Sequence, residues 1–347
     1  MSFNGAVGGA TGNVGSQMLR ILEEREFPIK RLVPLASTSS VGKTVMFRGE
    51  ALEVGNLATF DFSGIDILFL STGGENAKIT APRAAAAGCV VIDNSSAFRM
   101  DADVPLVVPE VNPNDLRDWN KRRILPVANC STIQLAVALK PLHDVAGLKR
   151  VVISTYQSMS GGGKRLVDRL LAEADPSEVN RLALQAAAMK GADGGEKPFA
   201  YNVVPHIDVF LEDGRTKEEW KMESEIRRIL NLPDLPVSAT CVRVPVIVGH
   251  AESVNIELER SLTAKEARKI LDKAPGMQVL DEHQSGGYAT PLDVAGTDPV
   301  WVSRIREDRS VPFGLNMWIV ADNVRKGAAL NAVQIAEELL LQGALSR

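Results

Sequence analysis

The chain has 347 residues, of which 45% are hydrophobic and 24% are charged, and its formal net charge is −4. This length favours two domains of ordinary size, and the composition is that of a globular protein with a large core. The weakly acidic balance excludes the basic footprint that nucleic-acid binding requires.

The sequence indicates neither a membrane-targeting segment nor a disulfide framework. No apolar run is long enough to span a bilayer, and the first residues do not resemble a signal peptide. Three scattered cysteines (Cys89, Cys130 and Cys241) argue against a disulfide framework. We therefore expect a cytoplasmic protein without membrane contact, and we identify no metal site.

The first predicted element is a short apolar strand at residues 3–7, which leads into a glycine-rich turn. Apolar residues with helical spacing follow at Val14, Met18 and Leu22. A strand, a glycine turn and a helix form the context in which backbone N–H groups bind a dinucleotide pyrophosphate. The spacing differs from G-x-G-x-x-G, and a purely structural turn is the alternative. The predicted cofactor-binding residues of this turn are Gly9, Thr11, Gly12, Asn13, Val14 and Gly15.

The next strand, at residues 31–36, indicates which dinucleotide binds. An NAD site usually has an acidic residue after this strand, where it binds the ribose 2′-hydroxyl. Here the strand is followed by Ser37, Ser39 and Ser40, with Lys43 just beyond. Hydroxyl groups and a nearby cation suit a 2′-phosphate. We therefore predict NADP as the cofactor, with an ordinary polar loop as the alternative.

Strands and helices alternate through the rest of the first half. A hairpin at 44–48 and 51–54 precedes a buried strand at 65–72, an alanine-rich helix at 75–87 and a strand at 88–92. This order predicts a doubly wound, Rossmann-like α/β domain.

A short stretch around Cys130 is the strongest candidate for chemistry. An apolar strand at 124–128 stops at Asn129, and helical spacing begins at once with Ile133 and Val137. Cys130 is therefore predicted at a helix N-terminus, where free N–H groups and the helix dipole favour an anion. A thiol at this position should be shifted towards the reactive thiolate. The alternative is a small buried residue that fills a tight turn.

The second half predicts an α+β domain. A strand at 151–157 ends in a glycine-rich run at 158–164. The other predicted elements are helices at 164–174, 177–189, 218–230 and 263–271, a glycine-rich linker at 192–198, strands at 237–248, 253–259, 300–306 and 315–320, and a final helix at 323–342. The alternation within these strands is typical of a mixed or antiparallel sheet.

Motifs along nearly the whole chain resemble the aspartate-semialdehyde dehydrogenase family. They are GATGNVG at 9–15, NSSAFR at 94–99, NCST at 129–132, YQ at 156–157 with SGGG at 160–163, EEWKM at 218–222, RVPV at 243–246 with GH at 249–250, and Asn316. Each motif is modest by itself, but their common order is specific.

The resemblance implies a homodimeric enzyme that interconverts aspartate 4-semialdehyde and 4-aspartyl phosphate with NADP and inorganic phosphate. Its reductive direction leads towards lysine, methionine and threonine. The resemblance also implies an NADP-binding domain at residues 1–130 plus about 323–347, to which the last helix returns. A substrate-binding and dimerisation domain would span residues 131–322.

The same resemblance implies roles for individual residues. Cys130 would form a thioester, and His250 would act as general acid/base, for which an imidazole is suited near neutral pH. Gln157 would orient the substrate. Arg243 would bind the substrate α-carboxylate, because its planar fork matches a carboxylate.

Further residues would complete the site. Glu218 would bind the substrate amino group, with Glu219 as a competing candidate for that role. The other implied ligands are Asn129 beside the nucleophile, Lys221 and Arg99 for phosphate, and Ser160, Gly161 and Asn316 near the nicotinamide. The remaining histidines, His143, His206 and His283, are predicted to be structural.

Other functions are less well matched. An N-acetyl-γ-glutamyl-phosphate reductase shares the fold and the thioester chemistry, but its motif around the cysteine differs. A glyceraldehyde-phosphate-type dehydrogenase would bind a sugar phosphate, for which the Arg243 fork is less suited. A non-catalytic NADP-binding relative would be favoured by loss of Cys130 or His250, and both are present.

Overall fold

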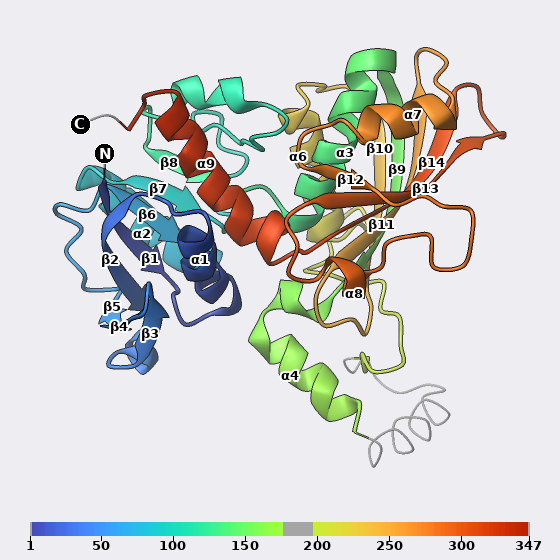
Figure 1. Cartoon of the computed structure of the whole chain (residues 1–347). Coiled ribbons are helices and arrows are strands. Elements are labelled where there is room, and N and C mark those ends of the chain that lie inside the picture. Colours follow the sequence, from blue (N-terminus) through green and yellow to red (C-terminus); the bar gives the residue numbers. More distant parts are fainter. Residues whose placement is uncertain (1, 176–196, 346–347) are drawn as a thin grey trace.

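The computed structural model describes residues 2–175 and 197–345. Two six-stranded sheets, one in each half of the chain, form the centres of two domains that lie side by side (Figure 1). The predicted combination of a Rossmann-like domain and a second α+β domain is confirmed.

The first sheet is parallel throughout. In spatial order its strands are β5 (Gly55–Asn56), β2 (Ile29–Ala36), β1 (Phe3–Gly8), β6 (Ile67–Leu70), β7 (Val90–Asp93) and β8 (Ile124–Pro126). Helices α1 (Asn13–Glu24) and α2 (Gly74–Ala86) connect successive strands. The predicted hairpin is a separate two-stranded sheet of β3 (Thr44–Phe47) and β4 (Glu50–Glu53).

Strand β6 is an unbroken apolar run because both of its faces are covered. Ile67 and Phe69 belong to the core that includes α1, whereas Leu68 and Leu70 belong to the core that includes α2. A strand has a side-chain period of two, so alternate residues enter opposite cores. The absence of polar residues in this run thus follows from its central place in the sheet.

The second sheet is mixed. In spatial order its strands are β10 (Val237–Arg243), β9 (Leu148–Gln157), β11 (His250–Leu258), β14 (Gly314–Ala321), β13 (Val300–Asp308) and β12 (Met277–Val279). Strands β10 and β9 are parallel, as are β12 and β13, and the other pairs are antiparallel. Its helices are α3 (Cys130–Ala146), α4 (Lys164–Glu173), α6 (Lys217–Ile229) and α7 (Ala264–Leu271). Short helical turns occur at η1 (Thr38–Ser40), η2 (Pro113–Asp118), η3 (Met159–Gly162) and α8 (Pro291–Val294).

The end of the chain returns to the first domain, as expected. Helix α9 (Leu330–Leu341) packs against α1 and β7 (Figure 1). The predicted helix at 323–342 was wrong in one respect, because it opens with a π-helical turn, η4 (Arg325–Ala329). In this turn the N–H groups of Gly327 and Ala329 bond to the carbonyls of Asp322 and Val324, five residues earlier.

Two other predictions need comment. The strand predicted at 237–248 ends at Arg243, because Pro245 has no N–H to continue the ladder. The predicted helix at 177–189, and the linker at 192–198 except for its last two residues, lie outside the described residues. Within residues 2–175 and 197–345, no helix has the length and apolar character needed to cross a membrane.

Candidate active site

A cavity of about 630 Å³ lies where the two domains meet. On one side it is bounded by the segments that follow β6, β7 and β8, and such carboxyl ends of parallel strands are where open α/β sheets bind ligands. The predicted site residues that line it are Val14, Arg99, Asn129, Cys130, Gln157, Ser160, Gly161, Glu218, Lys221 and Arg243.

Cys130 is the first residue of α3, and Asn129 is its N-cap. The Asn129 side-chain oxygen accepts hydrogen bonds from the N–H groups of Ser131 and Thr132, at 3.0 and 3.3 Å. This capping joins strand β8 directly to α3, and it directs the half-buried Cys130 into the cavity.

The predicted shift of Cys130 towards thiolate is not found in this state. Burial, assisted by the negative charge of Glu218, raises the pKa of the Cys130 thiol to about 12, against the opposing effects of Arg99 and Arg243. The Ser131 N–H at the helix N-terminus also opposes this rise, but burial outweighs it. Arg99 and Arg243 are therefore the side chains that favour a thiolate at this position.

His250 is the first residue of β11 and is fully buried. Its Nδ1 accepts a hydrogen bond from the Ser158 backbone N–H at 3.0 Å, so we assign its proton to Nε2. Burial and the nearby Arg243 guanidinium hold the pKa of His250 well below its usual value of 6.5. Its Nε2 has no hydrogen-bond partner among the described residues and faces Gly161, where an added Cβ would lie 3.0 Å from it.

Arg243 and Gln157 lie side by side at the ends of two parallel strands. They are register partners in β10 and β9. One guanidinium nitrogen of Arg243 donates to the Ser158 carbonyl at 2.7 Å, and the Gln157 amide donates to Glu218 at 3.3 Å. Among the described residues, Arg243 has no ion-pair partner, which leaves its buried charge available to a ligand.

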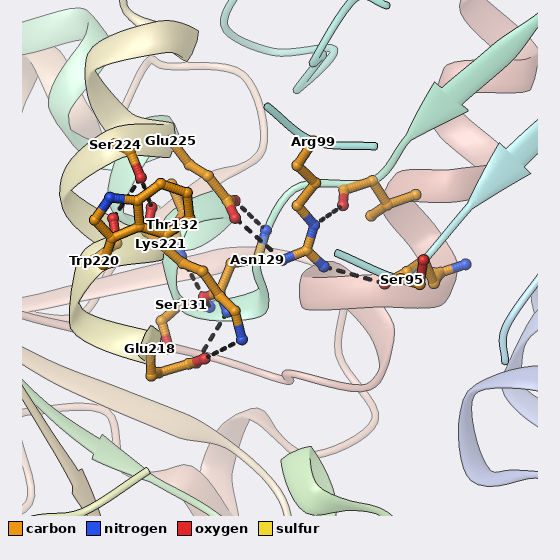
Figure 2. Close-up of polar contacts among 12 residues, drawn as sticks. Ser95, Arg99, Asn129, Ser131, Thr132, Glu218, Trp220, Lys221, Ser224 and Glu225 are labelled. Carbon is orange, nitrogen blue, oxygen red and sulfur yellow. Dashed lines mark hydrogen bonds and ion pairs between the residues drawn. The ribbon is translucent and has the colours of Figure 1, made fainter. Parts of the chain in front are cut away.

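Helix α6 presents Glu218 and Lys221 to the cavity (Figure 2). Glu218 accepts a hydrogen bond from the Asn129 side-chain amide at 2.9 Å and pairs with Lys221 at 3.1 Å. Lys221 also pairs with Asp208 at 2.7 Å. The competing candidate Glu219 points elsewhere, because its carboxylate accepts from the N–H groups of Thr216 and Cys241.

Arg99 reaches the cavity from the loop after β7 (Figure 2). Its guanidinium donates to the Val127 carbonyl at 2.8 Å, to the Asn94 carbonyl at 3.1 Å and to Glu225 at 3.1 Å. A guanidinium has five N–H groups, so these three bonds leave two for a ligand.

In the glycine turn, the start of helix α1 lies very close to the backbone of Gly9. Gly9 has a φ of +81°, and a Cβ at Gly15 would lie 2.1 Å from the Gly9 carbonyl oxygen. Neither position can therefore accept a side chain without moving the turn. Gly12 is the N-cap of α1, which begins at Asn13.

The hydroxyl groups predicted to bind the 2′-phosphate lie together near this turn. Thr11 donates to the Ser40 hydroxyl at 3.3 Å, and Lys43 donates to the same hydroxyl at 3.5 Å. Ser37 and Ser39 form a neighbouring hydroxyl pair at 3.0 Å.

The structure does not support the predicted contact of Asn316 with the cofactor. Asn316 lies within β14, accepts a hydrogen bond from Asn255 at 3.0 Å and does not line the cavity. Asn323 lines it instead. Its side-chain oxygen accepts from the Gly249 N–H at 2.9 Å, and its amide donates to the Ser160 hydroxyl at 3.0 Å. Asn323 is the second residue after β14. A polar residue just beyond the end of a strand is a common position for a ligand contact, and this signal could have indicated its role.

His250 does not itself line the cavity, although Gly161 beside its Nε2 does, and the other three histidines lie elsewhere. His143 accepts from the Leu148 N–H, His206 stacks on Phe210 at 4.2 Å, and His283 lines a separate hollow. The sequence analysis gave no individual role to the other cavity residues, which are Ser71, Thr72, Gly73, Asn94, Ser96, Ala128, Gly162, Gly163, Ile207, Asp208, Asn323, Val324, Gly327 and Ala328. No group of three or more His, Cys, Asp or Glu side chains within the described ranges could hold a metal ion.

Comparison with known proteins independently supports the resemblance to aspartate-semialdehyde dehydrogenases. The model "Semialdehyde dehydrogenase, NAD binding domain" matches residues 5–119, and "Semialdehyde dehydrogenase, dimerisation domain" matches residues 139–326. The chain is 50% identical to the aspartate-semialdehyde dehydrogenase of Aquifex aeolicus over 99% of both chains. It is also 50% identical to that of Legionella pneumophila, over 97% of this chain and 95% of the relative.

A solved structure agrees with these relatives. Aspartate semialdehyde dehydrogenase II from Vibrio cholerae, complexed with ASA, is 45% identical and superposes with a TM-score of 0.90, over 98% of this chain and 99% of that one. The matched models cover the second sheet and the first sheet except for β8 and the start of β1, and the identities extend over nearly the full length. The chain is therefore a pyridine-nucleotide-binding oxidoreductase that belongs to the aspartate-semialdehyde dehydrogenase family.

Proposed function

We propose that this chain reduces 4-aspartyl phosphate to aspartate 4-semialdehyde with NADPH, and catalyses the reverse reaction with phosphate, through a thioester on Cys130. The observation that carries this proposal is one cavity in which Cys130, Arg243 and Arg99 meet beside the nucleotide turn. The Vibrio cholerae relative, whose printed title names a complex with ASA, supports the same substrate.

Cys130 carries the acyl group. In the reductive direction its thiolate attacks the acyl carbon, so a C–S bond forms, the bond to the phosphate oxygen breaks and inorganic phosphate leaves. Bound NADPH supplies the hydride that reduces the thioester. The resulting thiohemiacetal then breaks its C–S bond, which releases the aldehyde and regenerates the sulfur nucleophile.

Three cationic side chains, Arg243, Arg99 and Lys221, bind different parts of the substrate. Arg243 binds the α-carboxylate, because it is buried and has no carboxylate partner among the described residues. Glu218 binds the amino group, and Gln157, which donates to Glu218, orients the same end of the substrate. Arg99 and Lys221, each of which already pairs with a carboxylate, bind the phosphate. A carboxylate offsets part of the positive charge of each of these two side chains, so they hold phosphate less tightly than unpaired cations would. This suits phosphate, because it must leave during the reaction.

His250 completes the acid/base chemistry from a fixed tautomer. Because Nδ1 accepts the Ser158 N–H, the Nε2 proton is the one available to the substrate. His250 thus stabilises the developing oxyanion as a hydrogen-bond donor from Nε2. As general acid/base it must pass through the imidazolium form, because a neutral ring that gave up its Nε2 proton would become an imidazolate. Gly161 leaves the space through which a substrate oxygen reaches Nε2.

NADP is the preferred nucleotide. The cluster of Thr11, Ser40 and Lys43 supplies donors without a carboxylate, which fits a 2′-phosphate better than a 2′-hydroxyl. Asn323, Ser160 and Gly161 line the cavity beside Cys130, where the nicotinamide must lie for hydride transfer. We therefore give Asn323 the role first predicted for Asn316.

The proposed enzyme is a cytoplasmic homodimer. The match of residues 139–326 to a dimerisation-domain model supports the assembly. Tyr156 of β9 is 37% exposed, and its ring lies at a tilt against Trp318 of β14 on the sheet face opposite α3, which supports that face as the contact surface.

A steady-state assay tests this function. Aspartate semialdehyde and N-acetylglutamate semialdehyde are compared as substrates, each with phosphate and with either NADP or NAD. We expect turnover with aspartate semialdehyde and NADP. Preference for the N-acetylated substrate would contradict the proposal, because Glu218 would then have no ammonium group to bind.

Cys130→Ser is the matched variant for the thioester. A hydroxyl at this position is too weak a nucleophile, so we expect turnover to be lost while NADP binding, measured by fluorescence titration, stays within about twofold of the wild type. Near-normal turnover in Cys130→Ser would end the thioester scheme.

A further inference from the structure

Glu225 is a buried carboxylate next to the site that the proposed reaction does not use. It lies on α6, on the same face as Glu218 and Lys221, and only 1% of its side chain is exposed. It does not line the cavity. A buried charge is costly unless it is paired, so its partners indicate what it does.

The two oxygens of Glu225 bind two different parts of the site (Figure 2). Oε1 accepts from Nη1 of Arg99 at 3.1 Å, and Oε2 accepts from the backbone N–H of Asn129 at 2.6 Å. Arg99 belongs to the first domain, Glu225 to a helix of the second, and Asn129 precedes the nucleophile Cys130. One carboxylate therefore fixes the phosphate ligand relative to the start of α3.

The pair also sets the charge that a phosphate meets. Burial raises the pKa of Glu225, and the positive charge of Arg99 together with the Asn129 N–H opposes this rise. The carboxylate thus depends on Arg99 to stay ionised, and in return it offsets much of the positive charge of Arg99. An incoming phosphate is attracted to Arg99 and repelled by Glu225 behind it.

We propose that Glu225 is a positioning residue that orients Arg99 and weakens its hold on phosphate, so that this group can leave. This inference rests on the proposed function, in which Arg99 binds phosphate. A merely structural carboxylate would affect all substrates alike, whereas Glu225 affects phosphate alone and does so through Arg99.

The test is the Glu225→Gln variant, assayed with aspartate semialdehyde, NADP and varied phosphate. Gln keeps the size and one acceptor oxygen but removes the charge. We expect the KM for phosphate to fall by roughly tenfold, because a charge repulsion at short range is lost, while the KM for the semialdehyde stays within about twofold. An unchanged or raised phosphate KM would overturn the inference.

The control is Glu223→Gln, on the same helix but the opposite side, where Glu223 pairs with Arg215 instead. We expect its phosphate KM to equal that of the wild type. An equal fall in both variants would overturn the inference, because it would indicate a general effect of charge.

A double-mutant cycle with Arg99→Met tests the route through Arg99. In the Arg99→Met background Glu225 lacks the cation that keeps it ionised, so Glu225→Gln should no longer change the phosphate KM. Multiplicative effects on KM would overturn the inference. A wild-type phosphate KM in Arg99→Met would overturn the proposed role of Arg99, and the inference with it, whereas absence of semialdehyde turnover in the wild type would overturn the proposed function itself.

Discussion

His250 and Cys130 illustrate how burial alters the chemistry of single residues in this site. Burial favours the neutral form of both groups, since it lowers the pKa of the imidazole and raises that of the thiol. Arg99 and Arg243 oppose the rise in the thiol pKa, whereas Arg243 adds to the lowering of the imidazole pKa. The Arg243 guanidinium thus favours a thiolate at Cys130 and a neutral ring at His250.

The lowered pKa of His250 has a consequence for stability. The unfolded chain protonates this imidazole near pH 6.5, whereas the folded state keeps it neutral to a lower pH. The unfolded state thus binds more protons below pH 6.5, and folding stability falls as pH falls. Above pH 6.5 the contribution is complete.

We expect His250→Asn to remove this part of the pH dependence, while its amide oxygen still accepts the Ser158 N–H. Urea unfolding between pH 5 and pH 8 measures the effect. The wild type should lose stability below pH 6.5 faster than the variant, by up to about 1.4 kcal/mol per pH unit. Parallel pH profiles would mean that His250 titrates normally.

Arg243 offers a second test at the residue scale. Arg243→Lys keeps the charge but replaces a planar fork with a point charge, so the bidentate contact to the substrate carboxylate is lost. We expect the KM for aspartate semialdehyde to rise by about tenfold or more, with a smaller change in kcat. An unchanged KM would mean that Arg243 has a structural role, such as holding the Ser158 carbonyl.

At the scale of elements, the π-helical turn η4 is packed directly on the nucleophile. A Cβ added at Gly327 would lie 2.8 Å from the Cys130 Cβ and 3.2 Å from its Cα. The turn cannot move away, because buried Lys326 pairs with Glu110 at 2.6 Å and the Asn323 side chain is bonded on the other side of the cavity. A side chain at position 327 would therefore collide with Cys130, so a glycine is needed there.

We expect Gly327→Ala to displace Cys130 by a few tenths of an ångström and to lower kcat strongly, approaching a hundredfold. Gly74→Ala is a suitable control, since Gly74 is also helical and an added Cβ would meet no atom within 4 Å. Wild-type kcat in a folded Gly327→Ala protein would show that Cys130 tolerates the shift.

Elements with local signals were predictable from the sequence. The apolar run of β6 and the Asn129-Cys130 junction gave the correct strand and helix start, because their causes lie in neighbouring residues. Glu225 and Asn323 were not found, since their partners are distant: Glu225 bonds to Arg99 across 126 positions and Asn323 to Ser160 across 163. The pKa of Cys130 was mispredicted for the same reason, because it depends on burial.

At the scale of the whole molecule, the site is a junction held by ion pairs and hydrogen bonds. Arg228 of α6 donates to the carbonyls of Asp101 and Val104 in the first domain. Arg325 of η4 pairs with Glu24 at the end of α1. The family resemblance predicted the return of the last helix, but local sequence patterns could not indicate these contacts between domains. The boundary near residue 130 stays a prediction.

The return of the chain through Asn323 and Gly327 affects how the enzyme is made. During translation, Cys130 leaves the ribosome long before the segment that packs against it. A nascent chain therefore carries the thiol without its final neighbours, and the cavity closes only when the last helix docks on the first domain. Catalytic competence thus waits for the segment that carries Asn323 and Gly327.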